Sequence, residues 1–526
     1  MRRICTLFLT ALLTLAACEQ SDLPEAESRA PEEDVYHGMI QLGEKLDDPY
    51  TLANMQEALT KVYPTKAGRV ILETTDLYVR FIPQDDNQLD TLRSRGLYLM
   101  DHPMDYSIVR EGDYYQDPEV GDEDITWQYA VVPKDFGFPK GIRYEVLDEC
   151  YFAENDKTAT KADPDIDWTA VEAEAFRITG NEELWAAATK GGAVAPAGRI
   201  TIEDPNFSGG KPFGVAGVQV SCNVFVKFSS CYTTRDGYYQ MPRTFLGNPR
   251  YRLVFQNEKS FSIGFNFILI PASVSTLGRG GNQGIDYHVT AGGDAALFRR
   301  CAVNNAAYDY FSRCVDTDLD ITPPPGDLRF WIFPGLTASS ASMLHHGAFL
   351  DHQLLQKYLG NWLFLIQLFL PDITIGTSGQ ENYHDIFKLV QHELAHASHW
   401  GKVGNEYWSP YVQYIIQEFV SNPKLSYGDG SGNGAGQCEV GEMWAYFAQA
   451  SLMKDRYKTP MELFGDSYWF KPDILTSLYE LGMTRGQIFR ALKPGVTSTE
   501  DLREELIGIA PRMENDIIMA FNRYGK

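Results

Sequence analysis

The sequence predicts a multi-domain α+β protein. At roughly 100–200 residues per domain, a chain of 526 residues has room for about three domains. Hydrophobic residues make up 44% of the chain and aromatic residues 13%, which is enough to bury several cores. Short strand-like runs fill residues 195–275, whereas the pattern over 285–526 is mostly helical. We therefore expect an N-terminal α/β module, a β-sandwich and a mostly helical C-terminal domain.

The composition is strongly acidic. Asp and Glu number 70 against 46 for Lys and Arg, and the formal net charge is −24. Such a surface repels phosphate backbones, so the charge argues against nucleic acid as a partner. No apolar run approaches the ~20 residues that span a bilayer. The longest run, over residues 361–370, is typical of a buried helix.

Residues 1–17 have the pattern of an export signal. Arg2 and Arg3 precede an apolar stretch that is too short to span a membrane. The stretch ends in Leu-Ala-Ala before Cys18, which resembles a bacterial lipobox. The resemblance implies cleavage before Cys18 and a lipid on its sulfur, which anchors a protein without spanning the membrane. The alternative is an ordinary signal peptide with a chance cysteine near the cut.

Residues 18–34 follow as an acidic tether. Seven acidic residues stand against the single base Arg29, so the segment is solvated and repels itself. A lipobox followed by such a tether resembles the lipoproteins of Bacteroidetes, many of which reach the cell surface. The resemblance implies an extracytoplasmic protein that is lipid-anchored to the outer membrane or the cell surface.

Six cysteines remain outside the signal peptide and the lipobox. An exported chain permits disulfides, but six cysteines in about 500 residues do not make a disulfide scaffold. Cys222 and Cys231 are the best local pair, because both lie in one strand-rich stretch. Cys301 and Cys314 would share one helix, whose rise of ~20 Å over that interval forbids a bond. The absence of Cys-x-x-Cys argues against a cysteine-based zinc site.

Residues 35–190 mix helix and strand patterns and contain no chemical motif. The spacing of apolar residues predicts helices over 50–63 and 87–96, with two short strands over 69–83 between them. A polar stretch over 159–167 predicts a loop. The role of this module stays open between an inhibitory or chaperoning prosegment and a simple packing domain.

Residues 195–275 contain short strand-like runs broken by Gly, Pro, Asn and Asp, a spacing typical of a β-sandwich. The order of their motifs resembles the transthyretin-like regulatory domain found beside carboxypeptidases and on surface lipoproteins. The resemblance implies a non-catalytic accessory module, and a small lectin-like sandwich is the alternative. It rests on Gly198, Asp204, Pro205, Gly214, Val215, Thr234, Asp236, Gly237, Tyr238, Tyr239 and the run from Tyr251 to Phe255.

Residues 285–526 carry the strongest chemical signal, the segment His-Glu-Leu-Ala-His at 392–396. His392 and His396 are four residues apart, so a helix places both imidazoles on one face, within reach of one metal ion. Glu393 follows His392 directly, so on a helix its side chain is turned about the helix axis by one residue from His392. It can act as general base on a metal-bound water. Zinc lowers the pKa of such a water to ~7. The pattern predicts a hydrolytic zinc site, against the alternative of a satisfied histidine pair.

The surroundings of this segment resemble the zincin metallopeptidases. An apolar helical pattern continues upstream over 384–391, and a strand-like run at 371–377 precedes it. In zincins, such an edge strand binds substrate above the active-site helix. The metzincin pattern would need Gly in place of His399 and His in place of Lys402, which excludes that group.

The third ligand is expected from a second helix, which follows a Gly-rich loop over 421–437. This helix resembles the glutamate helix of gluzincins, in which Glu is followed three residues later by Ala. The resemblance makes Glu442, followed by Ala445, the expected ligand. Glu439 lies one turn earlier, and His399 shares the face of the two histidines. Both stay open as alternative ligands or as residues that support the ligands.

Two departures from the gluzincins limit what the resemblance implies. Trp400 stands where thermolysin-like enzymes have Asp, and the Gly-x-Met-Glu-Asn motif of zinc aminopeptidases is absent. The substrate class of neither group is therefore inherited. A tyrosine or histidine often stabilises the oxyanion in such sites, and Tyr446, Tyr427 and His384 are the candidates.

The sequence leads to two functional hypotheses. The first is a lipid-anchored zinc metallopeptidase that hydrolyses peptide or glycopeptide substrates outside the cytoplasm. The second is a surface lipoprotein that binds peptide or glycan and has a structural or vestigial zinc site. Glu393 favours the enzyme, because a structural site is closed and needs no base beside the metal.

Overall fold

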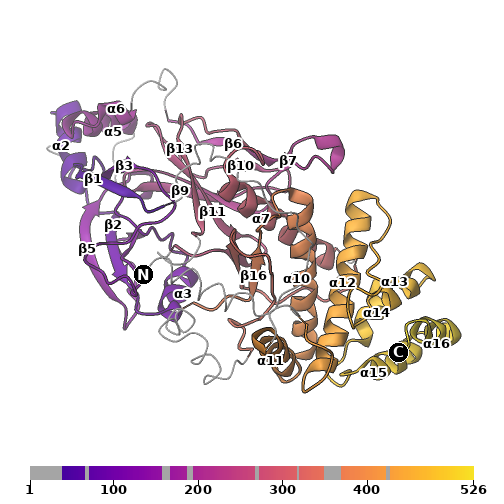
Figure 1. Ribbon diagram of the computed structural model, residues 1–526. Coiled ribbons are helices and arrows are strands. Elements are labelled where there is room, and N and C mark those ends of the chain that lie inside the picture. Colours follow the sequence, from indigo (N-terminus) through magenta and orange to yellow (C-terminus); the bar gives the residue numbers. More distant parts are fainter. Residues whose placement is uncertain are drawn as a thin grey trace.

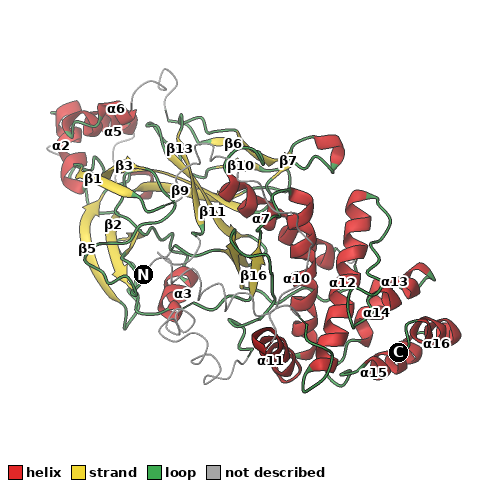
Figure 2. Ribbon diagram, in the orientation of Figure 1, coloured by secondary structure: helices red, strands yellow, loops and turns green. Residues whose placement is uncertain are grey.

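The computed structural model describes residues 38–65, 70–156, 166–185, 193–266, 272–316, 319–348, 369–421 and 427–526. The expected signal peptide, Cys18 and the acidic tether lie outside these residues, as do 361–368 and 159–165. The described residues form a mixed α/β structure (Figures 1 and 2), which confirms the expected combination of helices and sheets. None of the described helices is long and apolar enough to cross a membrane.

The N-terminal part, residues 38–185, packs helices against small antiparallel sheets. Of the two strands expected over 69–83, one forms, because the backbone N–H of Leu72 bonds to the side chain of Gln56 rather than to a neighbouring strand. The elements are β1 (Gln41–Lys45), α2 (Leu52–Val62), β2 (Asp76–Ile82), α3 (Asp86–Ser94), β3 (Tyr106–Arg110), β4 (Gln128–Pro133), β5 (Arg143–Cys150), α5 (Trp168–Ile178) and α6 (Glu182–Trp185). Strand β2 lies between β4 and β5, and β1 pairs with β3.

The central part is built from strands, in the region where the sequence predicts a sandwich. Its strands are β6 (Ala197–Ile202), β7 (Phe213–Gly214), β8 (Val218–Val224), β9 (Lys227–Tyr232), β10 (Tyr238–Gln240), β11 (Arg250–Asn257), β12 (Phe261–Ile263), β13 (Val274–Arg279) and β14 (Tyr287–Val289). Strands β10, β6, β14 and β7 form a four-stranded sheet.

The C-terminal part is mostly helical, as expected. Its elements are α7 (Ala295–Val315), β15 (Leu328–Phe333), β16 (Ile373–Gly376), α10 (Tyr383–Val403), α11 (Asn405–Ser421), α12 (Ala435–Tyr457), α13 (Asp473–Glu480), α14 (Arg485–Ala491), α15 (Thr499–Ile509) and α16 (Glu514–Arg523). Both strands predicted in this part, near 328–333 and 371–377, are present.

A seven-stranded sheet joins the central and C-terminal parts. Its order is β16-β15-β12-β11-β8-β9, and β13 also pairs with β11. The strands over 195–275 are therefore not a sandwich closed on itself, because β15 adds in parallel to β12 and β16 adds to β15. The outer edge of β16 is partly paired within the chain, since Ser340 and Thr374 exchange two backbone hydrogen bonds of 2.8 and 2.9 Å.

Helix α10 lies between α7 and α12 (Figure 1). Two side-chain bonds fix it against α7. The amide of Gln391 donates to the carbonyl of Ala306 (2.9 Å), and the hydroxyl of Tyr310 donates to Ser398 (3.0 Å). Because these side chains are buried, the bonds set the rotation of α10 about its own axis.

The N-terminal part contacts the rest of the molecule through ion pairs that all have the same arrangement of charge. The acid comes from the N-terminal part and the base from the central or C-terminal part. The pairs are Glu154 and Glu172 with Lys227, Glu154 with Arg243, Glu111 with Arg250, Asp113 with Arg300, and Asp86 and Asp90 with Arg329. The N-terminal part lies on the opposite side of the molecule from α12 (Figure 1).

The expected disulfide between Cys222 and Cys231 is wrong. Both thiols are free, as are those of the other described cysteines. Strands β8 and β9 do pair, but Cys222 lies opposite Ser229 and Cys231 lies opposite Val220. The two cysteines are thus diagonal neighbours rather than cross-strand partners.

Candidate metal centre

The helix that carries the histidine motif has clear start and stop signals. The side chain of Asn382 accepts a hydrogen bond from the backbone N–H of Asp385, which caps the first turn of α10. Gly404 ends the helix with a positive φ of 76°, and its N–H donates to the carbonyl of Trp400. The motif therefore lies in the middle of a continuous helix, as the sequence predicts.

Helix α12 is held against α10 and α11 at two points. The indole N–H of the buried Trp444 donates to the carbonyl of Ala395 (2.9 Å), one residue before His396. At the start of α12, a Cβ on Gly434 would lie 2.1 Å from the carbonyl oxygen of Pro410, so only glycine permits this approach to α11. These contacts turn the face that carries Glu442 toward the histidines.

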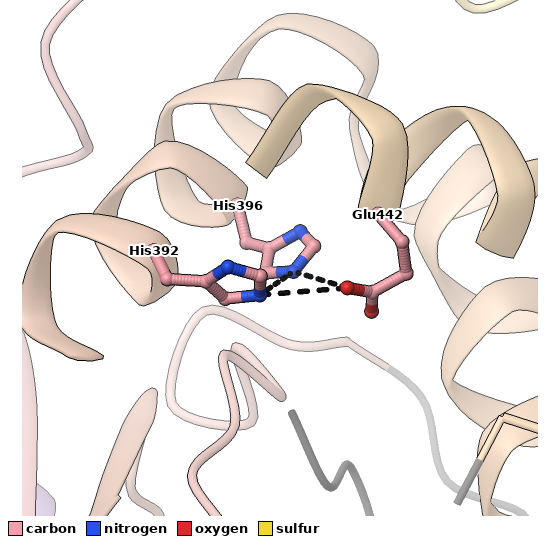
Figure 3. Close-up of side chains that lie close together, drawn as sticks. All are labelled: His392, His396 and Glu442. Carbon is pink, nitrogen blue, oxygen red and sulfur yellow. Dashed lines mark hydrogen bonds and ion pairs between the residues drawn. The ribbon is translucent and has the colours of Figure 1, made fainter. Parts of the chain in front are cut away.

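The side chains of His392, His396 and Glu442 converge on one point (Figure 3). The two Nε2 atoms are 3.1 Å apart, and Oε2 of Glu442 lies 3.4 Å from Nε2 of His392 and 3.5 Å from Nε2 of His396. Zinc–ligand bonds of about 2.0–2.1 Å at tetrahedral angles separate neighbouring ligand atoms by about 3.3 Å. The three atoms therefore have the spacing and the donor chemistry to hold a metal ion, which confirms that the predicted side chains converge.

The group is buried and its protonation is set by its neighbours. The side chains of both histidines are 2% exposed and that of Glu442 is fully buried. Nδ1 of His392 lies 3.1 Å from the amide oxygen of Gln449, which can only accept, so Nε2 keeps its lone pair toward the group. Burial raises the pKa of Glu442, but the neighbouring His396 and His392 lower it by more, so the pKa lies below its usual range.

Two residues that sequence reasoning missed support these side chains. The hydroxyl of Tyr411, on α11, donates to Oε1 of Glu442 at 2.5 Å. Gln449 lies seven residues after Glu442, so it occupies the same face of α12, and helical periodicity could have found it. No spacing signal links Tyr411 to the motif, because α11 reaches the site only through its packing on α10 and α12.

The two alternative ligands do not join the group. Glu439 accepts a hydrogen bond from Thr499 (2.9 Å) and forms an ion pair with Lys526, so its carboxylate is directed away from the histidines. His399 is fully buried against the rings of Tyr407 and Trp408, and burial lowers its pKa well below the usual value. It is therefore a neutral packing residue.

One of the three oxyanion candidates, Tyr446, lies beside the metal group, and Tyr427 contacts Tyr446 rather than the group. The ring of Tyr446 packs on His392 with centroids 4.5 Å apart, and its hydroxyl bonds to Tyr427 (2.9 Å) and Tyr468 (3.0 Å). His384 is not brought there. It lies in the first turn of α10, two turns before His392, where it contacts Asp385.

Glu393 is fully buried on α10 beside His392. It is not one of the three side chains that converge. No known protein family matches the chain, and no similar curated protein or solved structure matches it either. The function is therefore argued from the site alone.

Proposed function

We propose that the protein is an extracytoplasmic, lipid-anchored zinc metallopeptidase that hydrolyses peptide bonds in peptide or glycopeptide substrates. The observation that carries the proposal is the spacing of 3.1–3.5 Å among one oxygen and two nitrogen atoms, with a buried carboxylate next in sequence to the first histidine. Two histidines and one glutamate form the ligand set of many hydrolytic zinc sites. The gluzincin resemblance points to the same chemistry.

Each side chain has a separate task in this mechanism. His392, His396 and Glu442 would hold the ion, and zinc would supply Lewis acidity and lower the pKa of a water to ~7. Glu393 would accept the proton of the attacking water and pass it to the leaving amine. Tyr446 is the candidate donor to the oxyanion, because its ring already packs against His392.

The alternative is a binding lipoprotein with a structural or vestigial metal site. One observation favours it, which is the burial of the ligands, since their side chains are 2% exposed or less. A peptidase has to admit a substrate to this point, whereas a closed structural site does not. Glu393 separates the two functions, because a structural site has no task for it.

The test is the substitution Glu393→Gln, which keeps size and helix propensity but removes the base. Wild type and variant are given the same peptide library, and cleavage is detected by mass spectrometry. We expect unchanged zinc content and thermal stability, with hydrolysis reduced by at least about 10²–10⁴-fold. Equal cleavage by both proteins would overturn the mechanism. Binding of peptides or glycans by a wild type that cleaves none of the library would favour the alternative.

The proposed anchoring has its own test. Cys18→Ala should move the protein from the membrane fraction to the soluble fraction, because the acyl chains are then lost. Cys222→Ala is a suitable control, since that thiol is buried in a strand. Unchanged fractionation of the Cys18 variant would contradict the lipoprotein proposal and leave the peptidase proposal untouched.

A further inference from the structure

We propose that Tyr411 is a positioning residue that restricts Glu442 to a single ligand oxygen. The inference rests on the proposed metal centre and concerns how many atoms the protein offers to the ion. It follows from the separate partners of the two oxygens of Glu442, from the packing of Tyr411, and from the number of ligands that distinguishes catalytic from structural zinc sites.

The two carboxylate oxygens of Glu442 have different surroundings. Oε2 faces the Nε2 atoms of His392 and His396, at 3.4 and 3.5 Å. Oε1 accepts the hydroxyl hydrogen bond of Tyr411 at 2.5 Å, a length typical of a strong bond to an ionised carboxylate.

The ring of Tyr411 is held firmly enough to direct this bond. It is 4% exposed and packs edge-on against the fully buried Trp408, with ring centroids 4.8 Å apart. Its centroid lies 5.9 Å from that of His396. A buried tyrosine hydroxyl needs hydrogen bonding, and Glu442 accepts its bond, so neither group can turn away without breaking this contact.

The consequence concerns the fourth coordination position. Structural zinc sites have four protein ligands, whereas catalytic sites have three and leave one position for water or substrate. With Oε1 bonded to Tyr411, the protein offers one atom from each of its three ligands. Without that hydroxyl, Oε1 loses the bond that holds it away from the ion, and Glu442 could then offer a second oxygen to the open position.

The experiment compares the visible absorption of Co²⁺-loaded wild type and Tyr411→Phe, together with their Co²⁺ and Zn²⁺ affinities. The absorption bands of Co²⁺ report ligand number and geometry, so they respond to a change at Glu442 that leaves the fold intact. We expect Tyr411→Phe to change the bands, because a second oxygen of Glu442 then enters the coordination of Co²⁺, and to change metal affinity by about 10–100-fold. Tyr411→Met, which also lacks the hydroxyl, should give the same spectral change.

The matched control is Tyr407→Phe. Tyr407 lies one turn earlier on α11 and also reaches α12, through a hydroxyl contact with the carbonyl of Gln437 (3.5 Å). Its loss should leave the bands unchanged. Wild-type bands and affinity in both Tyr411 variants, or the same change in Tyr407→Phe, would overturn the role of Tyr411. A wild type that binds no Co²⁺ or Zn²⁺ would instead overturn the proposed metal centre.

Discussion

Two buried polar regions of the molecule have opposite chemistry. Where the N-terminal part meets the rest of the chain, a base faces an acid, as in Arg300 with Asp113 at 2.8 Å and Lys227 with Glu172 at 3.1 Å. At the centre between α10 and α12, two imidazole nitrogens and a carboxylate oxygen of Glu442 face one another at 3.1–3.5 Å.

The comparison shows that burial of charge alone does not identify a functional site. An ion pair between a base and an acid is complete, because each group satisfies the other. A group made of lone-pair donors needs a cation or added protons to be stable in a buried place. The centre at Glu442 is such a group of lone-pair donors. Its composition, rather than its position in the fold, distinguishes it from the ion pairs of the N-terminal part.

The largest effect is expected from removing a ligand. His396→Ala should abolish stoichiometric zinc, because a remnant of one histidine and one glutamate holds the ion poorly. Metal analysis after dialysis measures the loss. The control is His384→Ala, which removes a histidine from the first turn of the same helix, where its partner is Asp385. Full zinc content in His396→Ala would contradict the assignment of the group at Glu442 as a metal centre, and so the contrast with the ion pairs.

A substitution in the ion pairs between the N-terminal part and the rest of the chain should lower stability and leave the metal content unchanged. Lys227→Met leaves the carboxylate of Glu172, 13% exposed, without its main counter-charge. Breaking one partner of a buried pair costs about 3–5 kcal/mol of unfolding free energy. Denaturant unfolding measures this cost, and the double variant Lys227→Met with Glu172→Gln should recover most of it. Loss of zinc in either variant would show that the two regions are coupled.

The sequence was sufficient to predict which three side chains converge, because their signal is local. His392 and His396 are set by helical periodicity, and the resemblance to the glutamate helix led to Glu442 rather than Glu439. The expected mixture of helices and sheets is also confirmed, down to the strands near 328–333 and 371–377.

What the sequence could not predict depends on contacts between distant segments. The pairing of β15 with β12 joins residues that are far apart in the chain, so the sheet extends beyond the expected sandwich. The register of β8 and β9 decides that Cys222 and Cys231 stay reduced. Tyr411 reaches Glu442 because α11 folds back over the site, and neither composition nor periodicity carries that information.

A pH test of the structural contact uses Asp48, whose carboxylate accepts a hydrogen bond from the backbone of Val226 in the turn between β8 and β9. Burial raises the pKa of Asp48 to about 8, with smaller contributions from the charges of Asp105 and Asp148. Between about 4 and 8 the folded state thus binds more protons than the unfolded state, so the free energy of unfolding falls as pH rises. The stabilising effect is complete below about 4 and is lost as pH rises through about 8.

The substitution that tests this slope is Asp48→Asn, which keeps an acceptor for the backbone N–H of Tyr50 but cannot ionise. Its stability should depend less on pH, by at most about 1.4 kcal/mol per pH unit, the limit for one proton. Denaturant unfolding at pH 5, 6, 7 and 8 measures the difference. Parallel curves for variant and wild type would mean that Asp48 keeps its charge in the fold.

The smallest effect is expected at Glu439, three residues before Glu442 on the same helix. Its carboxylate bonds to Thr499 and Lys526, so it belongs with the ion pairs and not with the ligands. Lys526 is 24% exposed, and loss of a partly exposed pair costs about 1 kcal/mol or less. Glu439→Gln should therefore keep full zinc with nearly unchanged stability, whereas Glu442→Gln should bind zinc far more weakly. Zinc titrations of both variants measure this, and the reverse result would show that the third ligand is Glu439 and that the site rearranges when metal binds.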